Sequence, residues 1–313
     1  MMAEAPQSSH SAEPGPDSPV SAEKLAESGH CQEALPLLST AWERAADPDD
    51  QKRVGVDGLR CAMTLKDTDG ALDFMRRLNK RFPHDPAVLY LTVHVFSDLS
   101  IRASQQLLID APASYQVHAL NAEALETQGK WHEAAAEYRE VLKKDASLPG
   151  IHYRLGRLLL SGPQTVTSKE EARREFEEEL KIDPANAGAE YILGELARQN
   201  DEPASAVAHF ERATRLDAGF ADAFIGLGRT LLESGRNEES IPPLQVAAKL
   251  QPDNPAAHFY LGTAYQRTGR KAEAGQEFAR HQKATEKMQQ TRQEIQTGVA
   301  GPQQTIEPPK AQP

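Results

Sequence analysis

Two short segments of the sequence carry residue types that could do chemistry. His132 and Glu133 begin the segment HEAAAE, which starts like the zinc-binding pattern H-E-x-x-H, but Ala136 stands where the second histidine ligand would be. The segment SGPQTVTSK, residues 161–169, has the glycine, serine and lysine of a phosphate-binding loop. It lacks the second glycine before Lys169 and has no strand before it, so we interpret it as an inserted loop between helices.

Three histidines recur at one position of a repeated pattern: His118, His152 and His258. Equivalent residues of successive repeats lie two helices apart, and neighbouring helices pack about 8 to 10 Å apart, so these imidazoles cannot share one metal ion. We expect packing and polar capping roles for them.

The two cysteines, Cys31 and Cys61, lie thirty positions apart with no second pair and no histidine at ligand spacing. We expect neither a disulfide framework nor a zinc site, and interpret Cys61 as a small buried apolar residue and both as free thiols. No Ser-His-Asp or Cys-His arrangement can be argued from the order of residues. The prediction is a protein that is not an enzyme, without catalytic residues, metal or cofactor.

The charge of the chain excludes further classes. Its 35 basic and 46 acidic residues give a net charge of -11, which disfavours nucleic acid and anionic lipid as partners. The N-terminus lacks the basic start and apolar run of a signal peptide, and no segment has the apolar length of a membrane span. We therefore expect a soluble, cytoplasmic protein, or a periplasmic one if a leader was removed.

The elements that position these residues are helices. Apolar residues recur three and four apart, Ala, Leu, Glu, Arg and Lys dominate, and no long stretch alternates with period two, which predicts an all-α fold. Residues 1–20 and 298–313 are rich in proline with serine or glutamine, and we expect both tails to be disordered.

The strongest feature of the sequence is a repeat. Ala122, Gly156, Gly194, Gly228 and Gly262 occupy one position of five copies, with spacings of 34, 38, 34 and 34 residues. Leucine precedes each of the four glycines. Second helices carry a small residue and an aromatic four positions later, as in Ala134 with Tyr138, Ala172 with Phe176, Ala206 with Phe210 and Ala274 with Phe278. Pro184 and Pro252 close two copies, whereas Ser240 and Leu244 replace the small residue and the aromatic in one.

This pattern resembles the tetratricopeptide repeat, a helix-turn-helix unit of 34 residues. The resemblance implies a right-handed superhelical solenoid of stacked helix pairs, with five repeats in residues 114–283. We interpret residues 21–113 as about three degenerate pairs that continue the solenoid, the last of them a shortened pair. Residues 284–297 are interpreted as a polar helical extension that caps the array, with a coiled-coil partner helix as the alternative.

The resemblance also implies a binding surface, because the first helices of such repeats line a concave groove that holds a partner segment. The offsets of three before and one and four after the repeat glycine predict these groove residues: Glu123, Glu126, Tyr153, Arg157, Tyr191, Glu195, Arg198, Ile225, Arg229, Phe259, Thr263 and Gln266. Aromatic side chains beside arginine are frequent carriers of interface energy, although the rings could equally serve only to pack neighbouring helices. The Lys and Asn of a carboxylate clamp do not occur at these offsets.

The sequence therefore predicts a non-catalytic scaffold that binds a protein or peptide segment in its groove. The partner is not identified, and nucleic acid and membrane spans are not expected. A monomer is the expected state, with self-association as the alternative. Two other functions remain open: a structural or self-associating subunit of a larger complex, and the regulatory arm of a separate enzyme.

Overall fold

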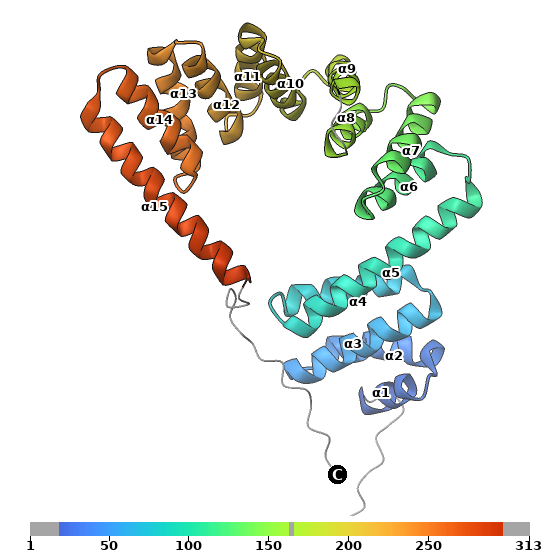
Figure 1. The fold of residues 1–313 in the computed structure, drawn as a ribbon. Helices are drawn as coiled ribbons and strands as arrows, with labels where there is room; N and C mark the ends of the chain where they lie inside the picture. The colour runs from blue at the N-terminus through green and yellow to red at the C-terminus, as the bar shows by residue number, and fades with distance from the viewer. Residues whose placement is uncertain (1–18, 163–165, 297–313) are drawn as a thin grey trace, which may run out of the picture. The chain divides into compact units, whose positions relative to one another are not determined.

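The computed structural model describes residues 19–162 and 166–296, and these fold into fifteen α-helices (Figure 1). The chain divides into two compact units, Met1–Pro112 and Ala113–Pro313, which we call unit 1 and unit 2. The predicted tails lie outside the described residues, except that α1 begins at Pro19. In the described part, no helix is both long enough and apolar enough to cross a membrane.

Unit 2 consists of five helix pairs, each formed by a first and a second helix. The pairs are α6 (Tyr115–Thr127) with α7 (Trp131–Lys144), α8 (Ile151–Ser161) with α9 (Val166–Ile182), α10 (Ala187–Gln199) with α11 (Pro203–Leu216), α12 (Ala221–Glu233) with α13 (Asn237–Leu250), and α14 (Pro255–Arg267) with α15 (Lys271–Gln296). Each second helix also contacts the first helix of the next pair, so the pairs stack in chain order. The predicted loop at 161–169 is shorter than expected, because α9 already begins at Val166.

Glycine determines how closely the two helices of a pair approach. A Cβ atom on Gly194 would lie 2.8 Å from the Phe210 ring, and one on Gly226 of the next pair would lie 2.6 Å from the same ring. Phe210 is fully buried between them. This recurring aromatic of the second helices therefore fills the space between two pairs.

The turns within the pairs also depend on glycine. Gly129, Gly235 and Gly269 have φ values of 71°, 77° and 80°, in the left-handed region that favours glycine. In the pair α10 and α11, Asp201 takes this conformation with φ of 60°. A residue in the left-handed conformation therefore ends each of these four first helices.

The three recurring histidines form part of a polar pair that links the two helices. The imidazole Nδ1 atoms of His118, His152 and His258 lie 2.6 to 2.7 Å from a carboxylate oxygen of the second helix, supplied by Glu137, Glu175 and Glu277. In the third pair the residue types are exchanged, and Glu190 of α10 lies 2.6 Å from His209 of α11. Each histidine and its glutamate thus obtain a hydrogen-bond partner within the pair, which gives the recurring histidine a role in packing.

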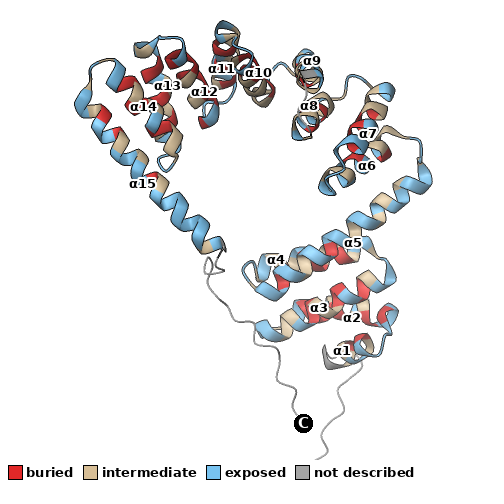
Figure 2. Ribbon diagram, viewed as in Figure 1, coloured by how far each residue is buried: buried red, intermediate tan, exposed pale blue. Residues whose placement is uncertain are grey.

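Unit 1 contains α1 (Pro19–Glu27), α2 (Cys31–Arg44), α3 (Pro48–Leu65), α4 (Thr68–Arg81) and α5 (Pro86–Asp110). Its helices share one apolar cluster, in which Leu38, Val54, Leu59 and Leu78 are almost fully buried. The predicted shortened pair in residues 87–112 is wrong, because α5 is a single helix of 25 residues. Figure 2 shows most of α5 in the colour of exposed residues.

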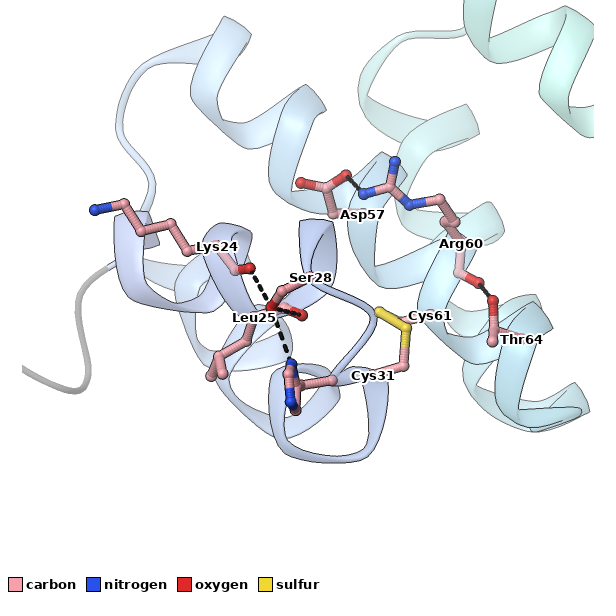
Figure 3. The surroundings of a disulfide bond; sticks show 9 residues. Lys24, Leu25, Ser28, Cys31, Asp57, Arg60, Cys61 and Thr64 are labelled. Atoms are coloured by element: carbon pink, nitrogen blue, oxygen red, sulfur yellow. Dashed lines mark hydrogen bonds and ion pairs between the residues drawn. A yellow bond between two sulfur atoms is a disulfide. The ribbon is translucent and has the colours of Figure 1, made fainter.

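The expectation of two free thiols is also wrong. Cys31, the first residue of α2, and Cys61 of α3 form a disulfide bond, with their Cα atoms 4.8 Å apart (Figure 3). Both cysteines are buried, and α2 packs directly against α3. The spacing along the chain could not show this proximity, because it results from the packing of two helices. Closure of a loop of about thirty residues stabilises a fold by roughly 3 to 4 kcal/mol in the chain-entropy description.

Candidate functional site

The candidate site is the side of unit 2 that is formed by its first helices, α6, α8, α10, α12 and α14. We call this side the first-helix face. The first helices α10, α12 and α14 contact one another as well as their own second helices, which brings side chains of consecutive first helices together. Residues three before and one after each repeat glycine lie on this face, since they are one helical turn apart.

The aromatic residues on this face are partly buried by their own pairs. The Tyr153 ring meets Phe176 edge to face with 5.6 Å between centroids, and the Tyr191 ring packs against Phe210 and Phe220 at 5.9 and 4.9 Å. Burial raises the pKa of the Tyr191 hydroxyl. The next pair also reaches Tyr153, since a Cβ atom on Gly188 of α10 would lie 2.7 Å from its hydroxyl, so packing accounts for much of the surface of both rings. Phe259, near the end of the array, is 44% exposed.

Two of the predicted arginines are neutralised within unit 2. The Arg198 guanidinium lies 2.8 Å from the Glu195 carboxylate and 3.9 Å from that of Glu233. Arg229 binds the other Glu233 oxygen at 2.8 Å and lies over the Tyr260 ring at 5.7 Å from its centroid. Glu195, Arg198 and Arg229 thus form a network with Glu233, a residue that the repeat offsets did not select.

Arg157 differs from these two arginines. It lies above the Tyr153 ring, 5.9 Å from the centroid, and is exposed. Within residues 19–162 and 166–296 it forms no ion pair. Of the three predicted groove arginines, it is the one whose charge is unpaired among these residues.

Arg157 borders a hollow of about 650 Å³, which we call the Arg157 hollow. The lining residues come from α6, the start of α7 and the length of α8: Glu126, Thr127, Trp131, Gly150, Tyr153, Arg154, Arg157, Leu158 and Ser161. Three of them, Glu126, Tyr153 and Arg157, were predicted from the repeat offsets. The structure therefore places these three around one space that is large enough for side chains of a bound segment.

Two further lining residues were missed by the repeat offsets. Trp131 is 37% exposed and begins α7, where the equivalent positions hold Pro203, Asn237 and Lys271. A tryptophan at a position that is otherwise polar or proline was the available signal. Arg154 contributes a second guanidinium, but it lies 3.0 Å from the Glu123 carboxylate and is thereby neutralised.

A buried carboxylate holds the start of α8 in place. Glu179 of α9 is fully buried, and its two oxygens accept hydrogen bonds from the backbone N–H groups of Gly150 and Tyr153 at 2.7 and 3.2 Å. A carboxylate at a helix N-terminus satisfies free N–H groups and interacts favourably with the helix dipole. Glu179 thus fixes the helix that carries Tyr153 and Arg157. The equivalent residue in the next pair is Ala213, so the repeat pattern gave no signal for it.

A buried tyrosine makes a further polar contact with an arginine that lines the hollow. Tyr138 of α7 is fully buried, and its hydroxyl lies 3.5 Å from Nη1 of Arg154. Burial, together with the nearby Glu126 carboxylate, raises the pKa of the Tyr138 hydroxyl to about 12. The tyrosine is therefore neutral at physiological pH and contributes no charge to the hollow.

The other predicted residues lie elsewhere on the first-helix face. Ile225 is half-buried, and the hydroxyl of Thr263 donates to the backbone carbonyl of Phe259 at 2.9 Å. Gln266 is exposed. A smaller hollow of about 300 Å³ lies beside Arg198 and is lined by Asp201, Thr230 and Glu233 among others. Among the described residues, no cluster of three or more His, Cys, Asp or Glu side chains could hold a metal ion.

Comparison with known proteins identifies the class of this fold. The family model described as tetratricopeptide repeat matches residues 101–165, 168–221 and 225–288, more than half of the chain. The chain therefore belongs to the tetratricopeptide repeat family, and its fold is an all-α solenoid of such repeats.

Solved structures show the same fold at low sequence identity. A crystal structure of MamA protein has 22% identity and a TM-score of 0.50, over 60% of this chain and 97% of that one. A MamA fragment, residues 41 to the end, from Desulfovibrio magneticus RS-1 has 20% identity, a TM-score of 0.50 and coverages of 55% and 96%. YrrB, described as a TPR protein with an unusual peptide-binding site, has 19% identity, a TM-score of 0.50 and coverages of 58% and 92%. Among curated proteins, the search finds no significant match.

Proposed function

We propose that this protein is a non-catalytic scaffold that binds a segment of another protein along the first-helix face of unit 2, with the Arg157 hollow as its main anchor. The observation that carries the proposal is the unneutralised guanidinium of Arg157 beside Tyr153 and Trp131, at the edge of a space of about 650 Å³. Aromatic side chains and arginine together supply most of the energy of many protein interfaces.

The chemistry of the hollow defines the segment that fits it. An acidic side chain would pair with Arg157, and an apolar or aromatic side chain would stack against Trp131, which is 37% exposed. Arg198 and Arg229 are already paired with carboxylates of unit 2. They would therefore contact the segment through their aliphatic stems. The partner in this proposal is an extended acidic and aromatic peptide segment.

The proposal assigns the binding repeats to residues 114–283, a supporting role to the helices of residues 21–113 and a polar cap to residues 284–297. The cap assignment is supported by α15, which continues to Gln296 without a break.

Selection from a random peptide library displayed on phage tests the proposal. The immobilised full chain should enrich peptides that combine an acidic residue with an aromatic one, and calorimetry should show weaker binding of such a peptide to R157A. Arg229→Ala is the matched control, because it removes an arginine from the equivalent helix position whose charge is already paired. Equal affinity of the selected peptides for the wild type and R157A would reject the hollow as the anchor.

A further inference from the structure

The long helix α5 of unit 1 exposes apolar side chains that a helix pair would bury. Leu89, Tyr90, Val93, Phe96, Ile101 and Leu108 are between 45 and 66% exposed. By helical spacing they lie on the side of α5 opposite Val88 and Val95, which are buried against the other helices of unit 1. We call these six residues the α5 stripe. It contains no charged residue.

Alignment with an intact pair shows what the first half of α5 lacks. Asp85 and Pro86 correspond to Asn254 and Pro255 at the start of α14, which places Val93 at the position of Gly262. In α14 that glycine lies against Phe278 of the second helix, where a Cβ would be 2.8 Å from the ring. Valine at this position prevents such a close approach by a second helix within the same pair.

The same alignment explains why α5 does not turn back. The turn glycine of the last pair, Gly269, corresponds to Ser100, and no residue of α5 has a positive φ. The helix therefore continues through the point at which the other pairs reverse direction. The family model nevertheless matches from residue 101, in the half of α5 that corresponds to a second helix. Thus α5 contains a first and a second helix of one repeat, fused end to end.

Each half of α5 therefore exposes the side that the other helix of an intact pair would cover. Leu89 and Val93 correspond to His258 and Gly262, which face the second helix, and both are exposed. Leu108 corresponds to Glu277, which faces the first helix from α15, and it is 48% exposed. The two halves are complementary, but a straight helix cannot bring them together within one chain.

We propose that the α5 helices of two copies of this chain pair antiparallel, so that the first half of each covers the second half of the other. This exchange restores the antiparallel direction of an intact pair twice, as in domain swapping. The absence of charge in the stripe lets two copies, each with a net charge of -11, meet there without like-charge contacts.

The exposed area is consistent with such a dimer. At roughly 100 Å² for each of the six side chains, two copies offer about 1,200 Å², the lower end of interfaces that hold stable complexes. A second α5 helix supplies both missing helix faces, that of a first helix and that of a second helix, in one straight segment. A partner of different composition would have to do the same.

Sedimentation equilibrium of the full chain, over a range of protein concentrations, tests this proposal. The wild type should show a monomer and dimer equilibrium. Val93→Glu and Ile109→Lys, one in each half of α5, should each weaken dimerisation at least tenfold, because a charge would be buried in an apolar contact. Ile109 is 73% exposed and corresponds to Phe278, the residue that lies against the glycine at the Val93 position. Ala103→Glu is the matched control, since it adds the same charge to an exposed position of α5 that corresponds to the exposed His132 of α7. Circular dichroism confirms that each variant stays helical.

Mixing the two weakened variants tests the direction of pairing. In the register of an intact pair, where Gly262 lies against Phe278, Glu at position 93 of one copy meets Lys at position 109 of the other, and the remaining half of the interface is native. The mixture should therefore form a heterodimer that neither variant forms alone. A monomeric wild type, a dimer unaffected by V93E and I109K, or a mixture that stays monomeric would each overturn the proposal.

Discussion

Two stretches of the first-helix face of unit 2 have similar residue types but different electrostatics. Around α8, Arg157 is exposed and unpaired beside a hollow of about 650 Å³. From α10 to α14, Arg198 and Arg229 are held by Glu195 and Glu233. Exposed ion pairs contribute little to stability, but they remove a charge from recognition. The comparison teaches that equivalent positions of the repeat differ in whether their charge is already paired, and the proposed function assigns the anchor to the stretch with the unpaired charge.

The largest expected effect follows from removing the aromatic anchor of the hollow. Trp131→Ala should weaken binding of a selected acidic and aromatic peptide by roughly 30-fold, about 2 kcal/mol, because a tryptophan in a desolvated contact contributes strongly to an interface. Isothermal titration calorimetry measures this loss. The same substitution should change the free energy of unfolding by less, since the indole is already 37% exposed in the free protein. An unchanged affinity would exclude the hollow as the aromatic site.

Arg157→Ala should reduce affinity for the same peptide by about tenfold, because a charge-assisted hydrogen bond is lost. Arg157→Lys should recover part of the loss, since lysine keeps the charge but not the planar fork of donors. Titrations in low and high salt separate the contributions. The affinity of the wild type should fall with added salt, whereas that of R157A should respond less.

Glu179→Gln tests whether the buried carboxylate positions the helix of the hollow. The amide oxygen can accept one of the two backbone hydrogen bonds, so the expected loss is about 1 to 2 kcal/mol in the free energy of unfolding and a few-fold in affinity. Urea denaturation and calorimetry measure the two effects. Glu178→Gln, at a neighbouring exposed position of α9, is the control and should change neither beyond a few tenths of a kcal/mol.

Arg229→Ala should leave peptide affinity within about twofold, and it should lower stability by less than about 1 kcal/mol, because its ion pair is partly exposed. This variant directly tests the difference between the paired and the unpaired arginine. If R229A weakened binding as strongly as R157A, a paired arginine would contribute as much as an unpaired one, and the distinction between the two stretches would be wrong.

The smallest effect concerns pH. The pKa of Tyr138 is raised to about 12 by burial, whereas an unfolded tyrosine has a pKa near 10. The folded state therefore holds this proton more tightly. Its contribution to stability is fully present below pH 10 and is lost as pH rises from about 10 to 12. Urea unfolding of the wild type and Tyr138→Phe at pH 8 and pH 11 measures this effect: the free energy of unfolding of the wild type, relative to that of Tyr138→Phe, should be lower at pH 11 than at pH 8.

The repeat pattern predicted the fold because each local signal agrees with the packing. The glycines that lie against aromatics, the left-handed turn glycines and the helical periodicity were all visible in the residues. The disulfide could not be predicted, since the proximity of Cys31 and Cys61 depends on how α2 and α3 pack. The continuous α5 was missed because helical periodicity does not register a missing turn residue at Ser100.

The groove residues were predicted only as candidates, and they remain so. Repeat offsets select a side of a helix but not the partners of its charges. The acids that neutralise Arg198 and Arg229 come from one helix and from the next, and Glu179 reaches α8 from α9. Such contacts depend on side-chain packing between helices that a pattern of spacings does not contain.

Photo-crosslinking of a selected peptide tests the central claim most directly. A photoreactive amino acid would be incorporated at Ser161, which lines the Arg157 hollow, or at the exposed Gln266 of α14. The account predicts a crosslink to the acidic and aromatic core of the peptide from position 161 and little or none from position 266. Equal crosslinking from both positions, or crosslinking from position 266 alone, would contradict the assignment of the anchor to the α8 stretch.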